Sequence, residues 1–389
     1  MKNLSQISNP NRDDKVISAC GLFGMMNLQG ETFSGRDIVK AIANMHTRGN
    51  GLGGGLAVYG IYPDYKDMYA LHIMFQSRRG KEETEYFLKD AFEVAYDEEV
   101  PHRDVPDVYD PPLVWRYFVR PAIPTEDAMQ DDYVVEKVMF INTEIQDAFV
   151  FSSGKNMGVF KGVGYPEDIG RYFCLEDYEG YLWTAHARFP TNTQAWWGGA
   201  HPFCILDWTV VHNGEISSYG TNRNFLEMHG YYCTMHTDTE VMAYAVDLLM
   251  RRHHLPVEIM AKIMAAPLWS EIDRMSEDER RMHTILRQVY SSLLINGPFT
   301  VIIANQSEMI GLGDRIRLRP LVAGMKGNML YLSSEEAPMR LVCPDLDLTW
   351  IPKGGEPIVG RLETKEVIYK NEPVLAGVDN NVITSSTRI

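Results

Sequence analysis

The segment VISACGLFGMMNL at residues 16–28 is almost entirely apolar and carries one thiol, that of Cys20, near its start. An apolar run of this kind without proline predicts a buried strand. Residues 1–15, MKNLSQISNPNRDDK, are predominantly polar and predict a flexible leader. Taken alone, a cysteine in such a strand is most simply a small buried hydrophobic residue.

Outward from this strand, the sequence predicts short strands on both sides of a helical block. A helix is expected at 34–46 with Ser34 as its N-cap, then an acidic helix at 82–99 and an irregular insertion at 100–135 that is rich in proline and aspartate. The remaining expected elements are strands at 54–62, 67–75, 148–153, 157–162, 181–189, 205–214, 298–306, 309–314 and 328–334, and helices at 216–229, 238–254 and 276–294. This order predicts an α+β fold with largely antiparallel sheets.

The composition disfavours several classes of protein. The 389 residues include 52 acidic and 37 basic side chains, and the resulting net charge of −15 argues against non-specific binding to nucleic acid or anionic lipid. No run approaches the ~20 consecutive apolar residues of a membrane helix. The five cysteines are widely spaced and include no C-x-x-C pair, so we expect neither a disulfide framework nor a metal cluster held by this chain, and a cytoplasmic location.

A glycine-rich stretch, GNGLGGG at 49–55, superficially resembles a dinucleotide-binding loop. It follows an expected helix and leads into an expected strand, which is the reverse of the order that aims a helix N-terminus at phosphate. A turn or a close approach of backbone is therefore the favoured interpretation.

Four segments carry the residues that suggest chemistry: ACGLFG at 19–24, HARFPTNT at 186–193, VVHNGEI at 210–216 and HTDTEV at 236–241. Each has a structural explanation of its own. Arg188 suits a surface ion pair, and the Asn-Gly pair in the third segment favours a tight hairpin turn. The fourth segment fits a capping box, in which Thr237 is the N-cap of a helix and the Glu240 side chain reaches back to it.

In this order the four segments resemble the class II glutamine amidotransferases, which are N-terminal-nucleophile hydrolases. The resemblance runs from Cys20 to about Arg361 and includes RG at 48–49, AHP at 200–202, RPL at 319–321 and SSE at 333–335. HARFPTNT, AHPF, HNGEI, RDVP at 103–106 and VFKGVG at 159–164 are most similar to the amidotransferase portion of glutamate synthase. The family implies an αββα sandwich. It also implies a leader at 1–19, one amidotransferase domain at 20–361 with an insertion at about 98–147, and a C-terminal extension at 362–389.

The resemblance implies a thiol nucleophile whose base is its own α-amine. A free N-terminal Cys20 supplies both groups, because an α-amino group has a pKa of about 8, close to the working pH. By the same resemblance, the Asn213 side-chain amide and the Gly214 backbone N–H form the oxyanion hole. Arg188 would bind the α-carboxylate of glutamine, and Asp238 its α-ammonium. Further residues expected at the site are Phe189, Thr191 and Asn192, with Arg48 in a supporting role.

The amidotransferase segments are expected to feed ammonia to a partner, since no phosphoribosyl-pyrophosphate motif, adenylation loop, dinucleotide fingerprint or cysteine cluster is present. Resemblance to split glutamate synthases implies a partner subunit with FMN and an iron–sulfur cluster, and no cofactor in this chain. Three alternatives stay open: the amidotransferase subunit of another synthase, such as one that makes N-methylglutamate; a regulatory subunit with an idle site; and a thiol hydrolase of other amides.

The leader generates a prediction. Cys20 can act as its own base only if its amine is free, and removal of the initiator methionine cannot free it because residue 19 is alanine. We expect cleavage between Ala19 and Cys20, by the Cys20 thiol itself, as related glutamate synthases also carry a short propeptide. Intact-mass measurement of the purified protein should show a chain that begins at Cys20. A catalytically active form that still carries residues 1–19 would contradict this prediction.

Overall fold

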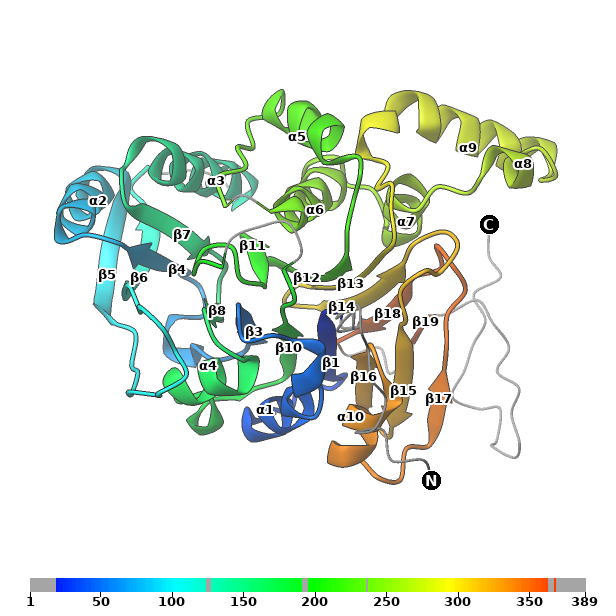
Figure 1. Ribbon diagram of the computed structural model, residues 1–389. Coiled ribbons are helices and arrows are strands. Elements are labelled where there is room, and N and C mark those ends of the chain that lie inside the picture. The colour runs from blue at the N-terminus through cyan, green and yellow to red at the C-terminus, as the bar shows by residue number, and fades with distance from the viewer. Residues whose placement is uncertain (1–18, 124–126, 191–194, 236, 363–366, 369–389) are drawn as a thin grey trace, which may run out of the picture.

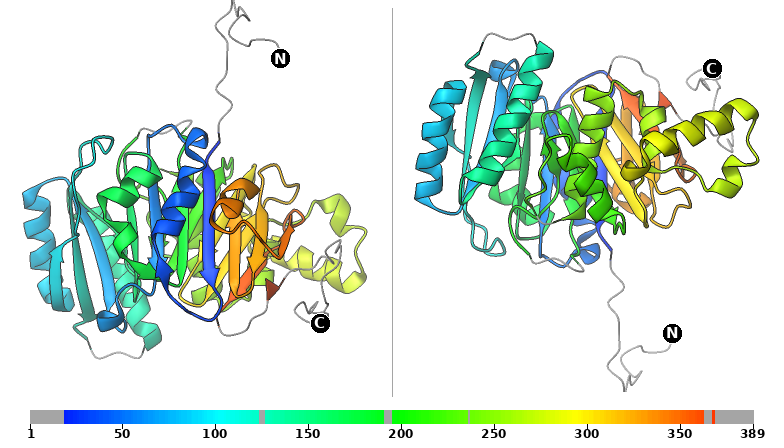
Figure 2. Two further views of the ribbon diagram at one scale, coloured as in Figure 1. Left: turned by 90° about the horizontal axis from the view of Figure 1, so that it is seen from below. Right: turned by 90° about the horizontal axis from the view of Figure 1, so that it is seen from above.

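The computed structural model describes residues 19–123, 127–190, 195–235, 237–362 and 367–368. Two stacked antiparallel sheets, with helices on both outer faces, form the body of the molecule (Figure 1, Figure 2). This αββα arrangement confirms the predicted α+β fold. Most of the expected leader (1–19) and of the expected C-terminal extension (362–389) lies outside the described residues.

The first sheet has the predicted strand after Cys20 near its centre. In spatial order its strands are β17 (Leu348–Trp350), β15 (Val322–Lys326), β16 (Met329–Ser333), β1 (Gly21–Asn27), β10 (Leu182–Ala187), β3 (Gly54–Tyr59) and β8 (Met157–Gly162). All seven residues of β1 are buried, because β16 and β10 flank it and other layers cover both its faces. That burial explains the continuous apolar run in place of an alternating pattern.

The second sheet carries the segment that contains Asn213 and Gly214. Its strands, in order, are β11 (Phe203–Ile205), β12 (Trp208–Gly214), β13 (Phe299–Ala304), β14 (Glu308–Gly313), β18 (Ile358–Arg361) and β19 (Val367–Ile368). The chain leaves β12, passes through the whole helical block, and returns as β13 to pair with it.

Helices cover the two outer faces of this pair of sheets. Those on the first sheet are α1 (Arg36–Ala43), α4 (Pro166–Tyr172) and α10 (Glu336–Val342). Those on the side of the second sheet are α5 (Tyr219–Glu227), α6 (Asp238–Val246), its π-helical continuation (Asp247–Arg252), α7 (Val257–Met264), α8 (Trp269–Ile272) and α9 (Glu277–Val289). The N-cap of α1 is Gly35 and not Ser34 as predicted, although the Ser34 hydroxyl accepts the backbone N–H of Arg36 at 3.2 Å.

A third antiparallel sheet stands beside the sandwich. It contains β5 (Phe92–Glu99), β6 (Leu113–Pro121), β4 (Tyr69–Phe75) and β7 (Ala148–Ser152), with α2 (Arg78–Ala91) and α3 (Asp127–Glu144) packed on it. This unit spans 69–152 and so extends beyond the insertion expected at about 98–147. The prediction of irregular structure at 100–135 is wrong, because β6 and the start of α3 fall within it.

The prediction of a helix at 82–99 is also wrong for its second half, because α2 ends at Ala91 and the chain continues as β5. Pairing with β6 decides this outcome. Trp115 donates its indole N–H to Asp97 at 2.8 Å, and Arg116 forms an ion pair with Glu98. Such cross-strand contacts override the local preference of an acidic segment for helix.

Three short 3₁₀ segments and one further pair of strands complete the connections outside the sandwich. The strands are β2 (Phe33–Ser34) and β9 (Glu179–Gly180), and the 3₁₀ segments are η3 (Pro63–Tyr65), η4 (Leu175–Asp177) and η6 (Ser291–Leu293). A fourth 3₁₀ segment, η2 (His46–Arg48), follows α1 and leads toward the pocket described below.

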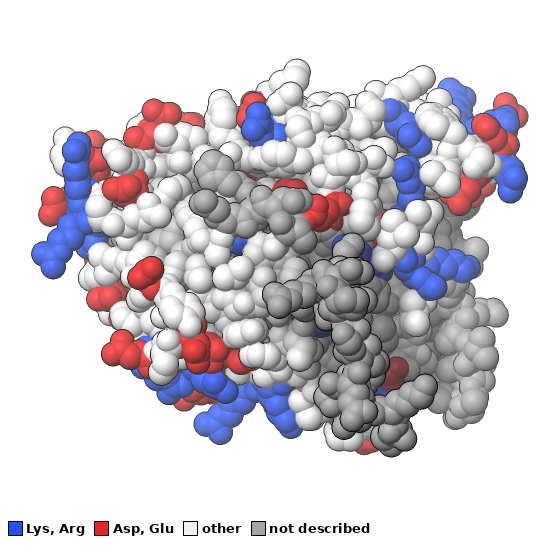
Figure 3. All heavy atoms as spheres, in the orientation of Figure 1, with Lys and Arg blue, Asp and Glu red and all other residues white. Residues whose placement is uncertain are grey.

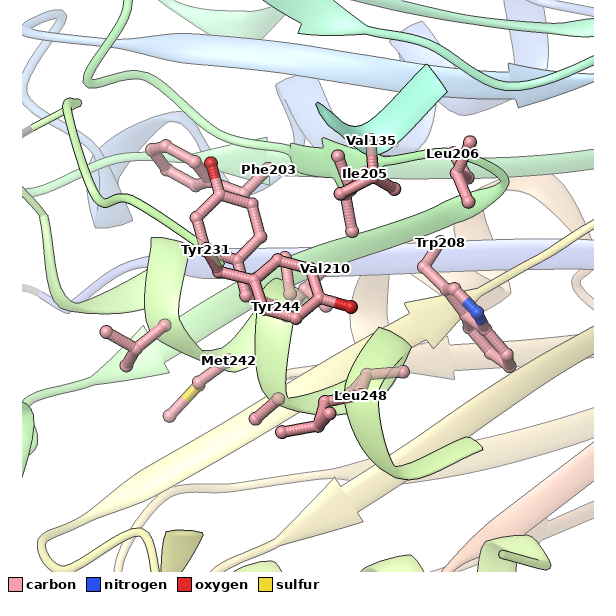
Figure 4. Packing of buried hydrophobic residues seen from close by; sticks show 14 of the residues in the cluster. Val135, Phe203, Ile205, Leu206, Trp208, Val210, Tyr231, Met242, Tyr244 and Leu248 are labelled. Carbon is pink, nitrogen blue, oxygen red and sulfur yellow. The ribbon is translucent and has the colours of Figure 1, made fainter. Parts of the chain in front are cut away.

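A hydrophobic cluster packs the second sheet against α6 and the third-sheet unit (Figure 4). Phe203 and Val210 of the paired strands β11 and β12 lie against Tyr244 of α6, and Val135 of α3 belongs to the same cluster. This core fixes where α6 begins, and therefore where Asp238 lies.

The surface in Figure 3 carries acidic and basic side chains interspersed with uncharged ones. The net charge of −15 is not gathered into one acidic patch on that face. Among the described residues, no helix has the length and apolar character needed to cross a membrane.

The packing between the two large sheets generates a prediction. Ile302 of β13 is fully buried there, and a Cβ on Gly24 of β1 would lie only 3.3 Å from its Cγ2 atom. Ile302→Ala should lower the free energy of unfolding by about 2–5 kcal/mol through the cavity it leaves. The matched control is Ile285→Ala on α9, where the isoleucine is 48% exposed and the change should stay within about 0.5 kcal/mol. Urea unfolding measures both, and equal effects would contradict the packing described here.

Candidate active site

One pocket of about 480 Å³ brings together most of the residues predicted from the sequence. It lies where β1 begins and β10 and β12 end, near the start of α6. The predicted residues that line it are Cys20, Arg188, Phe189, Asn213, Gly214 and Asp238. Thr191 and Asn192 lie outside the described residues, and Arg48 contacts the site from behind Cys20.

The Cys20 thiol lies directly before β1, where the backbone N–H of Phe189 donates to Sγ at 3.3 Å. Burial raises the pKa of the thiol, while the Phe189 N–H and the Arg188 guanidinium act in the opposite direction. Ala19, still attached to Cys20, lines the same pocket. In this uncleaved form the thiol is thus protonated at neutral pH and needs a base before it can attack.

Arg48 holds the backbone of the cysteine. It closes η2, its Nε donates to the Cys20 carbonyl oxygen at 3.2 Å, and its Nη1 lies 2.5 Å from a carboxylate oxygen of Glu335. The ion pair orients the guanidinium, which in turn fixes the carbonyl next to the thiol. The contact places Arg48 beside Cys20, and its supporting role stays a prediction.

Asn213 offers an amide donor without a partner. Its side chain is 1% exposed, and Nδ2 has no hydrogen-bond acceptor among the described residues. Leaving a buried donor unpaired costs about 1–3 kcal/mol, so such a group in a pocket wall is available to a ligand oxygen.

Gly214 follows in the same strand, and the structure corrects the hairpin prediction made for this pair. Asn213 pairs with Thr300 and Gly214 with Phe299, so both are in strand and not in a tight turn. Gly214 has φ +156°, and a Cβ on it would lie 2.0 Å from the carbonyl oxygen of Pro298. The glycine is required by this approach of two chain segments, which is why the local turn signal misled.

Arg188 is held by the glycine-rich stretch at 49–55. Its backbone N–H donates to the Gly53 carbonyl at 3.0 Å, and a Cβ on Gly53 would lie 2.9 Å from the arginine Cδ atom. The interpretation of this stretch as a close approach of backbone is therefore confirmed. The Arg188 side chain is 3% exposed and directed along the pocket wall.

Asp238 is the first residue of α6 and lines the same pocket as Arg188. Burial alone would raise its pKa, but His212 and hydrogen bonds from the Ile216 N–H and the Thr239 hydroxyl outweigh burial and lower it. The carboxylate is therefore ionised at neutral pH. A negative group at a helix N-terminus is also favoured by the helix dipole.

The capping box predicted for this helix forms only in part. Thr237 is the N-cap and its hydroxyl accepts the N–H of Thr239, as expected. Glu240, however, does not reach back to Thr237, because its carboxylate accepts the backbone N–H groups of Thr234 and Met235. Burial raises the pKa of Glu240 to about 7.

The sequence reasoning assigned no role to several residues that the structure places in this wall. His201, His212, Thr239 and Arg319 all line the pocket. A signal was present, since the segments HARFPTNT, AHPF and VVHNGEI each carry one histidine. No local rule indicates that the three rings converge.

Comparison with known proteins places the chain in a family. The family model "Glutamine amidotransferases class-II" matches residues 110–372. A protein of unknown function from Archaeoglobus fulgidus is 60% identical over 358 residues, covering 91% of this chain and 95% of that protein. A Methanothermobacter thermautotrophicus protein, named provisionally as a glutamine amidotransferase, is 24% identical over 86% of this chain and 97% of its own length.

Among solved structures, glutamine phosphoribosylpyrophosphate amidotransferase of B. subtilis is similar with a TM-score of 0.44 and 15% identity, over 88% of this chain and 47% of that one. The family match, which covers more than half of the residues, carries the assignment. The chain belongs to the class II glutamine amidotransferases.

Proposed function

We propose that this protein hydrolyses L-glutamine to glutamate and ammonia through a thioester on Cys20. The observation that carries the proposal is the unpaired amide donor of Asn213, buried in the same pocket as the Cys20 thiol. Arg188 and Asp238 supply one positive and one negative group in that pocket, matching the two charges of an α-amino acid.

The chemistry begins with proton transfer within one residue. Once its α-amine is free, Cys20 can pass its thiol proton to that amine, and the thiolate attacks the side-chain carbonyl carbon of glutamine. The oxygen then becomes an oxyanion, which the Asn213 amide and the Gly214 N–H stabilise. The α-ammonium returns the proton to the leaving nitrogen, the C–N bond breaks, and ammonia departs. Water cleaves the thioester by the same route and releases glutamate.

Substrate choice follows from the charged pair. A guanidinium binds a carboxylate through two parallel hydrogen bonds, and a carboxylate accepts hydrogen bonds from an ammonium group. An amide that lacks either charged end forgoes the contact with Arg188 or with Asp238. The pair therefore favours glutamine over other amides, against the alternative of a general thiol hydrolase.

We also propose that residues 1–19 are a propeptide. With Ala19 attached, the Cys20 nitrogen is an amide and cannot accept the thiol proton. Ala19 lies in the pocket beside the thiol, so the peptide bond to be cleaved is within the site that would cleave it.

The finer proposal is that the ammonia passes to a glutamate synthase partner. Its support is the similarity of HARFPTNT, AHPF and HNGEI to the amidotransferase portion of that enzyme. In this proposal the FMN and the iron–sulfur cluster belong to the partner, which combines ammonia with 2-oxoglutarate and reduces the product to glutamate with two electrons from an external donor. The amidotransferase subunit of an N-methylglutamate synthase would present the same catalytic half.

A glutaminase assay tests the proposed activity. Purified protein should release glutamate from glutamine, and Cys20→Ala should release none because the nucleophile is lost. Asn213→Ala should lower kcat by about 100- to 1000-fold, as expected for the loss of one oxyanion donor. The matched control is Cys343→Ala, which removes a thiol from outside the pocket and should retain activity. No glutamine hydrolysis, by the isolated protein or by its native complex, would contradict the proposal, and would favour an idle regulatory subunit.

Affinity capture of the tagged chain from its native host tests the proposed partner. The expected companion is a flavoprotein with iron–sulfur absorbance that forms glutamate from glutamine and 2-oxoglutarate. Capture should be equally efficient with Cys20→Ala, since binding does not need the thiol, while glutamine-dependent synthesis should be lost. A companion that instead forms N-methylglutamate, or one without flavin, would overturn the assignment to glutamate synthase.

A further inference from the structure

Three buried histidines form a row behind the pocket. His186 in β10, His201 before β11 and His212 in β12 are each at most 5% exposed, and the rings of the first two stack with centroids 4.0 Å apart. Burial lowers the pKa of His186 to about 3 and that of His201 well below its ordinary value. Both rings are therefore neutral, and a neutral imidazole donates from one nitrogen only.

Hydrogen bonds fix which nitrogens donate. His186 Nε2 lies 2.8 Å from the backbone carbonyl oxygen of His212, which can only accept. The hydroxyl oxygen of Thr239 lies 2.6 Å from His201 Nε2 and 3.0 Å from His212 Nδ1. It also lies 3.4 Å from a carboxylate oxygen of Asp238, while His212 Nδ1 is 3.7 Å from the same oxygen.

A carboxylate accepts but cannot donate, so the Thr239 hydroxyl gives its proton to Asp238 and accepts from the two rings. This arrangement places a proton on His212 Nδ1. His212 Nε2 has no partner among the described residues. The described residues contain no group of histidine, cysteine and acidic side chains arranged to hold a metal ion.

We propose that His212 and Thr239 are positioning residues that aim the Asp238 carboxylate at the α-ammonium of the substrate. The proposal rests on the glutaminase function given above. Asp238 retains 28% of its side-chain exposure at the pocket, and its other hydrogen bond is from the Ile216 N–H at 3.2 Å, to the second oxygen. Donors on both oxygens fix the plane of the carboxylate, which a single bond would leave free to rotate.

The row also links the two charged residues of the pocket. His186 lies two residues before Arg188 in the chain, and its ring is bonded to the backbone of His212. From His212 the contacts continue to Asp238. The network therefore runs from the strand that leads into Arg188 to the Asp238 carboxylate.

Two substitutions at one position distinguish the nitrogens of His212. The side-chain amide nitrogen of asparagine can take the place of Nδ1, and that of glutamine the place of Nε2. His212→Asn should keep the donor to Thr239, and so keep KM for glutamine within a few-fold of the wild type. His212→Gln should lose that donor and free the Thr239 hydroxyl to turn away from Asp238, which should raise KM by about 10- to 100-fold with kcat little changed, as for a lost hydrogen bond to a charged group.

An analogue that lacks the α-amine separates positioning from general damage. 4-Carbamoylbutanoate retains the carboxylate and the side-chain amide of glutamine, and its inhibition constant should be the same for His212→Gln and for the wild type. A similar loss of affinity for both compounds would overturn the proposal, as would a His212→Gln protein with normal KM for glutamine. Greater damage from Asn than from Gln would point to direct contact through Nε2, and equal damage would point to a role of the whole ring; either result would also overturn the proposal.

Circular dichroism tests whether His212→Gln folds. If it does not fold, Thr239 provides the same comparison. Thr239→Ser keeps the hydroxyl and should retain KM, whereas the isosteric Thr239→Val removes it and should raise KM for glutamine alone. All measurements use the purified, processed chain. Wild-type hydrolysis of glutamine establishes the proposed function separately, so the failure of one claim is not mistaken for failure of the other.

Discussion

The register between β1 and β10 is the constraint on which the site depends. Gly21 pairs with Ala187, so the next residues outward on the two strands, Cys20 and Arg188, come together where the sheet opens into the pocket. In an antiparallel pair a shift by one residue would turn every side chain to the opposite face. The burial of all seven residues of β1 makes such a shift costly, since polar neighbours would enter the core.

The second sheet supplies what the first lacks. Asn213 and Gly214 end β12, and Asp238 begins the helix packed on that sheet, so the residues proposed as oxyanion donors and the acidic group come from one side. The thiol and Arg188 arrive from the other. The two sheets pack against each other through a continuous core. The volumes of the buried side chains in this core therefore set the distances across the pocket.

Much of this arrangement could be predicted from the sequence. The strands with continuous apolar runs were predictable because a strand buried on both faces consists almost entirely of apolar residues. The pocket residues were predictable from the order of short motifs along the chain. Phe92–Glu99 was not, because its strand pairing with β6 is a contact between segments that local propensity cannot register. The pair Asn213-Gly214 misled for a related reason: glycine was needed for the approach of Pro298, not for a turn. The histidine row lay beyond prediction because its members meet only after both sheets have formed.

The position of Ala19 has a consequence for how this thiol first meets a reactive group. The sulfur and residue 19 share one compartment, so the earliest acyl carbon within its reach is on its own polypeptide. While Ala19 stays attached, it occupies space that an entering amino acid would need. Under the proposed cleavage, the unprocessed chain is its own competitive inhibitor, and maturation and the onset of turnover are one event.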